Sequence, residues 1–159
     1  MNRVSPVDGK ESWVSDHSNI QYNLDNLANI AKAKNKNETL VLADGVYYLD
    51  KPLVITGSVS LVSEGKGRRS ARLVFTDAQS DTALVTVKNC NGVVFDGINI
   101  KAFGDANRVI GLLSESNSSS VFSNFDIELQ LGFDCVSLKH WRNKKWGESC
   151  IYEKFDLRS

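Results

Sequence analysis

The spacing of apolar residues changes near residue 37. Between Ser18 and Lys34 the apolar positions recur at intervals of three or four and so form one stripe of a helix: Ile20, Leu24, Leu27 and Ala31. Ser18 and Gln21 have the spacing of a capping box, in which each side chain bonds the backbone N–H of the other residue. The pattern predicts one amphipathic helix over 18–34, ending in the polar run 34–37.

After Glu38 the pattern is that of short strands separated by turn-forming residues such as Asp44–Gly45 and Asn91–Gly92. The predicted strands are Leu40–Leu42, Val46–Leu49, Leu53–Ile55, Val59–Val62, Leu73–Phe75, Ala83–Val87, Val93–Ile100, Val109–Leu113, Val121–Leu131 and Cys135–Leu138. One helix followed by many short strands predicts an all-β domain. A sandwich, a barrel and a β-solenoid are all compatible with this pattern.

An internal repeat favours the solenoid. Residues 92–100 align with residues 119–127 at an offset of 27, and their apolar positions match: Val94 with Val121, Phe95 with Phe122, Ile98 with Phe125, and Ile100 with Ile127. In a parallel β-helix, residues one coil apart stack on each other, so the core-facing positions repeat with the coil length. The repeat therefore predicts coils of roughly 20 to 30 residues.

Composition excludes several classes of protein. The 159 residues suit one domain, and 19 basic against 19 acidic residues give no net charge, which argues against a dedicated nucleic-acid binder. No apolar run approaches the roughly 18 residues of a membrane span, and residues 1–19 lack the apolar segment of a signal peptide. The three cysteines cannot all pair within one chain, and we expect reduced, packed thiols.

The order of elements carries a family resemblance. The helix precedes Ala43–Asp44–Gly45–Val46–Tyr47, then the strand at 53–55, then Val59–Ser60–Leu61–Val62–Ser63, and later Asn91–Gly92–Val93–Val94–Phe95–Asp96–Gly97–Ile98. This order resembles the opening coils of pectate-lyase-like right-handed β-helices, above all those of bacteriophage tailspikes. The resemblance implies a right-handed parallel β-helix at 18–138 with an N-terminal capping helix. Residues 1–17 then form an arm, and 139–159 form a basic and aromatic C-terminal segment.

The resemblance also implies a function. A tailspike is a virion tail protein, made in the host cytoplasm, that works as a homotrimer joined to other tail proteins and recognises bacterial surface polysaccharide. It needs no cofactor, and the resemblance implies no nucleic-acid or membrane partner. Degradation of the polysaccharide is one alternative; a non-catalytic receptor-binding module and a polysaccharide lyase are the others. Whether the chain is a whole protein or a piece of a longer spike stays open.

Asp126 and Glu128 are the candidate catalytic pair. They are two positions apart on one predicted strand, so both face outward with Cβ atoms about 6.6 Å apart. Inverting glycosidases hold two carboxyls roughly 6.5–9.5 Å apart, with room for a water molecule between them. The alternative is an ordinary solvated strand face.

Arg108 and Trp141 are the candidate substrate-binding residues. Trp141 lies in a basic and aromatic run, 139–147, whose side chains could stack on sugar rings and bind their carboxylates. The alternatives are a surface ion pair between Arg108 and Asp105, and packing of the run on the solenoid flank or on a neighbouring subunit. The spacing of His140 from the cysteines does not make a zinc site, so we expect no metal.

Overall fold

The computed structural model describes residues 2–7, 15–65, 70–79, 82–90, 92–104, 109–115, 120–123, 126–131 and 152–153. These residues form strands β1 (Asn2–Val4), β2 (Glu38–Leu42), β3 (Gly45–Leu49), β4 (Leu53–Ile55), β5 (Val59–Ser63), β6 (Ala71–Phe75), β7 (Thr82–Lys88), β8 (Val93–Asp96), β9 (Ile98–Gly104), β10 (Val109–Glu115), β11 (Ser120–Ser123), β12 (Asp126–Leu131) and β13 (Tyr152–Glu153), and helix α1 (His17–Lys34). The described part of the chain is therefore mainly β with one helix, as the sequence predicts. The predicted strand Cys135–Leu138 lies outside the described residues.

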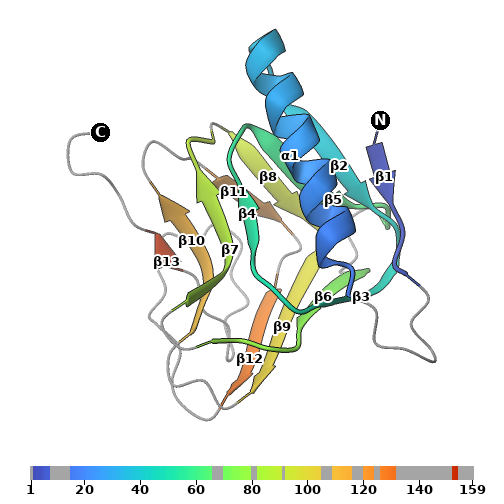
Figure 1. Ribbon diagram of the computed structural model, residues 1–159, viewed down its shortest axis with the longest axis vertical. Helices are drawn as coiled ribbons and strands as arrows, with labels where there is room; N and C mark the ends of the chain where they lie inside the picture. The colour runs from blue at the N-terminus through green and yellow to red at the C-terminus, as the bar shows by residue number, and fades with distance from the viewer. Residues whose placement is uncertain are drawn as a thin grey trace.

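The strands form three parallel sheets. Their orders are β1-β2-β5-β8-β11, β3-β6-β9-β12 and β4-β7-β10-β13 (Figure 1). Each successive triplet of strands, beginning with β2–β4, gives one strand to each sheet, so a strand pairs with the strand three places later in the chain. This arrangement is compatible with a β-helix-like fold.

The predicted repeat is confirmed by the strand pairing. β8 pairs with β11 at Val94↔Val121 and Phe95↔Phe122, and β9 pairs with β12 at Ile100↔Ile127. The offset of 27 residues seen in the sequence is thus the length of chain between stacked positions. One strand prediction needs correction, since Val93–Ile100 is divided into β8 and β9 at Gly97, which has φ +73°.

The core consists of side chains stacked from one triplet to the next. Tyr47, Leu73, Ile100 and Ile127 occupy one register row across β3, β6, β9 and β12, and all four are buried. Burying each such side chain stabilises the fold by about 1.5–3 kcal/mol. The Tyr47 hydroxyl donates a hydrogen bond to the Ala43 carbonyl oxygen at 2.6 Å, so the polar end of this side chain is satisfied inside the core.

Helix α1 packs against the first strands of the sheets. Its buried residues are Ile20, Leu24, Leu27, Ala28 and Ala31, and it contacts β1, β2, β4 and β5 (Figure 1). Close packing requires a glycine at Gly57, where a Cβ atom would lie 2.8 Å from the Ala28 Cβ. The predicted helix is confirmed to within one residue, because α1 begins at His17 and ends at Lys34.

The predicted capping box is wrong. The N-cap residue is Asp16, and no side-chain cap bond forms there. Gln21 instead bonds the backbone of β4: its Nε2 donates to the Val54 carbonyl oxygen at 2.8 Å, and its Oε1 accepts from the Val54 N–H at 2.9 Å. The amide of Gln21 therefore takes the place of a neighbouring strand beside Val54.

Each strand of the first triplet has partners on its outer side. β1 pairs with β2, Asp16 bonds Tyr48 of β3, and Gln21 bonds Val54 of β4. An uncovered strand edge presents unpaired backbone groups that favour pairing with other chains. The segment 2–21 thus protects this end of all three sheets, although the sequence gave no sign of strand β1.

Cys90 is expected to resist thiol reagents in the folded protein. Its thiol is fully buried, and its Sγ lies 2.8 Å from the Gly57 carbonyl oxygen. Burial raises the pKa of Cys90 to about 11, so on the order of one thiol in a thousand is ionised at pH 8. A Cys135→Ser/Cys150→Ser variant should therefore react with an aromatic disulfide reagent only as fast as it unfolds. Rapid labelling under native conditions would contradict this burial.

Candidate functional site

The outer face of the β3-β6-β9-β12 sheet carries a cluster of charged and amide residues. Strand register places Arg72, Asn99 and Asp126 in one row, because Arg72 pairs with Asn99 and Asn99 with Asp126. Lys101 and Glu128 pair in the row two residues further along. We call these five residues the polar ladder. Neighbouring strands are about 4.8 Å apart, so the first row spans about 10 Å.

Arg72 and Asn99 have side chains that can bind a ligand. Arg72 is exposed, and it makes no ion pair or hydrogen bond in the described part of the molecule. Asn99 is partly buried, and its Oδ1 atom is fully buried without a hydrogen-bond partner. An unpartnered buried acceptor costs about 1–3 kcal/mol, so a donor supplied by a ligand would be favourable there.

Apolar residues lie at the start of both rows. Val46 of β3 pairs with Arg72 and is 36% exposed, which is unusual for a valine in a sheet. Val74 lies between Tyr48 and Lys101 in the second row and is 7% exposed. The face therefore offers an apolar patch beside its charged groups, which is the combination that sugar-binding surfaces need.

The sequence-predicted site residues are placed only in part. Asp126 and Glu128 occupy alternate positions of β12, with Ile127 between them fully buried. The side chains of Asp126 and Glu128 lie outside the described part of the structure, as do Arg108 and Trp141 altogether. Their roles stay predictions.

Sequence reasoning missed Arg72, Asn99 and Lys101. The 27-residue repeat contained the signal for one of them, since Asn99 aligns with Asp126 within it. Extending the same offset by one coil places Arg72 beside Asn99, and this pairing is the one observed. Arg72 could have been found in this way, but it precedes the segment in which the repeat is recognisable.

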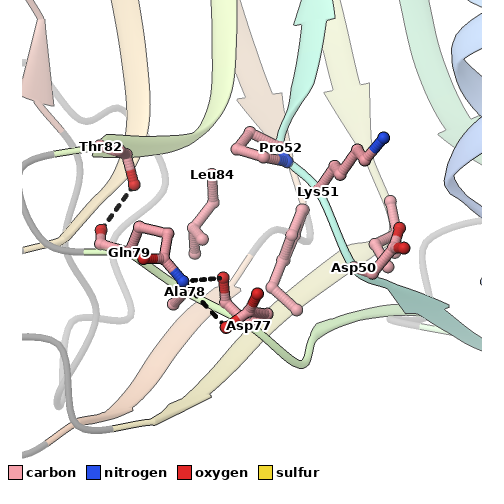
Figure 2. Close-up of a pocket in the computed structure, with 10 residues that line it drawn as sticks. Asp50, Lys51, Pro52, Asp77, Ala78, Gln79, Thr82 and Leu84 are labelled. Atoms are coloured by element: carbon pink, nitrogen blue, oxygen red, sulfur yellow. Dashed lines mark hydrogen bonds between the residues drawn. The ribbon is translucent and has the colours of Figure 1, made fainter.

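A second feature is a hollow between the first two triplets. It is lined by Leu49, Asp50, Lys51, Pro52, Phe75, Asp77, Ala78, Gln79, Thr82 and Leu84 (Figure 2). Its empty space is about 200 Å³ and open to solvent, which is below the roughly 300–1,000 Å³ of small-molecule sites. The hollow is thus too small for an oligosaccharide.

Internal hydrogen bonds also occupy the polar groups of the hollow. The Gln79 side-chain amide donates to Asp77 Oδ1 at 2.9 Å, and the Thr82 hydroxyl donates to the Gln79 carbonyl oxygen at 2.6 Å (Figure 2). The Ser15 hydroxyl donates to Asp50 Oδ1 at 2.7 Å, and this bond lowers the pKa of Asp50 below its usual value. These groups stabilise the corner of the fold, and the polar ladder is the better candidate site.

Metal and membrane sites were also considered. Among the residues that the structure describes, no three of the types His, Cys, Asp and Glu gather closely enough to hold a metal ion. The single described helix is not long and apolar enough to cross a membrane. Comparisons with protein-family models, with curated proteins and with solved structures find no match to this chain. The candidate function is therefore argued from the fold and the polar ladder.

Proposed function

We propose that the chain is the capped end of a right-handed parallel β-helix of the tailspike type, and that its polar ladder binds bacterial surface polysaccharide. The order of the three sheets supports the β-helix, because each triplet of strands lies beside the next in parallel register. Right-handedness follows from the strong preference of parallel crossover connections for that hand. The packing of α1 on β1, β2, β4 and β5 supports its role as the cap.

The polar ladder is the observation that carries the proposed function. Its strands present a flat, open face on which hydrogen-bonding groups are spaced by the strand separation of about 4.8 Å. A long sugar chain can bind such a face through many weak contacts at once, whereas the hollow of Figure 2 can hold only a small group. Exposed Val46 offers a surface for the apolar face of a sugar ring.

Asp126 and Glu128 are proposed to hydrolyse the bound polysaccharide by inversion. Glu128 pairs in register with Lys101, whose positive charge favours an ionised carboxylate, so Glu128 is assigned as the base that takes a proton from water. Asp126 pairs with the neutral Asn99 and is assigned as the acid that protonates the leaving oxygen. The other ladder residues hold the sugar chain across β6 and β9.

The proposed setting of the protein is the phage tail. There the chain is a homotrimer that contacts other virion tail proteins, and it is made in the host cytoplasm. Trimer assembly would cover strand edges at the far end of the sheets, which is a common way for β-proteins to avoid unwanted pairing. Light scattering of the purified protein measures this state directly.

A polysaccharide array followed by product analysis tests the proposed function. The array carries capsular polysaccharides and lipopolysaccharides from many bacteria, and each one bound is then incubated with the protein. New reducing ends without ultraviolet absorbance are expected for a hydrolase. An unsaturated, ultraviolet-absorbing product would replace the hydrolase with a lyase, and binding without cleavage would leave only the receptor-binding role. Binding to none of the polysaccharides would overturn the proposal.

A further inference from the structure

We infer that Arg72 and Asn99 form a subsite for an acidic sugar, a hexuronate that alternates with neutral sugars in the bound polysaccharide. This inference rests on the proposed function and names its substrate class. It concerns the end of the polar ladder on β6 and β9, two strand spacings from the acidic residues of β12 in the case of Arg72.

Arg72 provides the positive charge of the subsite. Its side chain is exposed and unpaired within the described residues, whereas Arg3 forms a 3.0 Å ion pair with Glu64. A guanidinium group binds a carboxylate through two parallel hydrogen bonds, and this geometry favours planar anions. An unpaired arginine on a polysaccharide-binding face therefore points to a carboxylate in the ligand.

Asn99 provides an acceptor beside that charge. Its Oδ1 is buried and has no partner, and its backbone pairs directly with that of Arg72. A carboxylate alone could not satisfy this atom, because a carboxylate only accepts hydrogen bonds. A hydroxyl group can donate to it, so the ligand should carry an anion and a hydroxyl about one strand spacing apart, near 4.8 Å.

A hexuronate meets both requirements within one ring. Its carboxylate would bind Arg72, a ring hydroxyl would donate to Asn99, and its apolar C–H face would pack on Val46. Val46 is 36% exposed and pairs in register with Arg72, so it lies at the outer end of the same row. A neutral sugar would leave Arg72 without an anionic partner.

The charge pattern favours a polysaccharide with spaced carboxylates over a polyphosphate. Asp126 and Glu128 lie on β12, next to β9 in the sheet, so a strand of regularly spaced phosphates across the face would meet two acidic residues. Like charges at close range oppose binding. A repeat in which neutral sugars separate the uronates can place its charge at Arg72 and a neutral linkage at β12.

Carboxyl reduction combined with an arginine variant tests the subsite. Each polysaccharide bound in the array is measured again after its uronates are reduced to neutral hexoses, with the wild type and with Arg72→Gln. We expect Arg72→Gln to weaken binding of the native polymer by about 10- to 100-fold. On the reduced polymer the same substitution should have no effect, since the interacting charge is gone. Lys34→Gln, which removes an exposed positive charge from α1, is the matched control and should bind as the wild type does.

The outcomes separate this inference from the proposed function. If the bound polysaccharides are neutral, or if Arg72→Gln weakens native and reduced polymers equally, the uronate subsite is wrong while polysaccharide binding stands. If no polysaccharide binds, the proposed function fails and the subsite with it. Arg72-dependent binding of a single-stranded oligonucleotide in place of a polysaccharide would assign the ladder to phosphate and would also overturn the inference.

Discussion

An Asp16→Ala variant is expected to lose about 2–5 kcal/mol of folding free energy. The Asp16 side chain is 1% exposed, and its two oxygens accept hydrogen bonds from different segments of the chain. Oδ1 accepts from the Val7 N–H at 2.7 Å, and Oδ2 accepts from the Tyr48 N–H at 3.0 Å. Hydrogen bonds to a charged group contribute about 1.5–3 kcal/mol each, and the substitution leaves both N–H groups without a partner.

This loss should be visible in urea and thermal unfolding followed by circular dichroism. For a chain of this size, 1 kcal/mol corresponds to roughly 2–4 °C in Tm. Asp25→Ala is the matched control: Asp25 is an exposed acidic residue of α1, and its removal should change stability by no more than about 0.5 kcal/mol. Asp16→Asn keeps one acceptor oxygen and should fall between the two. Equal stabilities for Asp16→Ala and Asp25→Ala would mean that the first turn of α1 does not anchor residues 2–7 to β3.

The second large effect is expected on catalysis. Asp126→Asn and Glu128→Gln should each lower the rate of polysaccharide cleavage by about 10²- to 10⁴-fold, because each removes one proton-transfer group from the proposed pair. The measurement is release of reducing ends from a polysaccharide found in the array, with circular dichroism to verify folding. Asp25→Asn, an acidic substitution on α1 away from the sheet, should keep full activity.

The two assigned roles can be distinguished. A substrate with a good leaving group needs no acid, so it should restore activity to Asp126→Asn. Azide can replace the activated water, so it should restore activity to Glu128→Gln. Cleavage at the wild-type rate by both variants would remove Asp126 and Glu128 from the mechanism and leave the ladder as a binding surface.

Much of the fold could be predicted from the sequence because its apolar positions follow simple periods. The helix stripe predicts α1 to within one residue, and the 27-residue offset predicts the pairing of Val94 with Val121 and of Ile100 with Ile127. These features depend on residues close in sequence, or on a repeat that the sequence contains twice. The packing of small apolar groups also followed from composition, as buried Cys90 illustrates.

The protection of the sheet edges could not be predicted in this way. The Gln21 amide bonds Val54, which is 33 residues later, and Asp16 bonds Tyr48, which is 32 residues later. Local patterns favoured a capping box for Gln21, but tertiary contacts gave its amide two backbone partners on β4. Strand β1 has only three residues, too few for a period, and it is stabilised by pairing with β2.

The polar ladder was predictable at one strand only. Alternation within 125–131 indicated Asp126 and Glu128, yet nothing within β6 marks Arg72 as their neighbour. Sheet register brings them together, since Arg72 is 27 residues before Asn99 and Asn99 is 27 residues before Asp126. A candidate site on a stacked sheet is thus determined by the coil length as much as by local sequence.

A disulfide across the ladder tests the stacked register most directly. Arg72→Cys/Asn99→Cys, made in the Cys135→Ser/Cys150→Ser background, places two thiols on directly paired positions about 4.8 Å apart, within the Cα range of disulfides. Arg72→Cys/Lys101→Cys shifts one thiol by two residues and separates the Cα atoms by about 8 Å, beyond that range. The account predicts near-complete oxidation of the first pair under mild conditions and little of the second. Failure of the first pair to form, or equal oxidation of both, would contradict the parallel stacking on which the polar ladder depends.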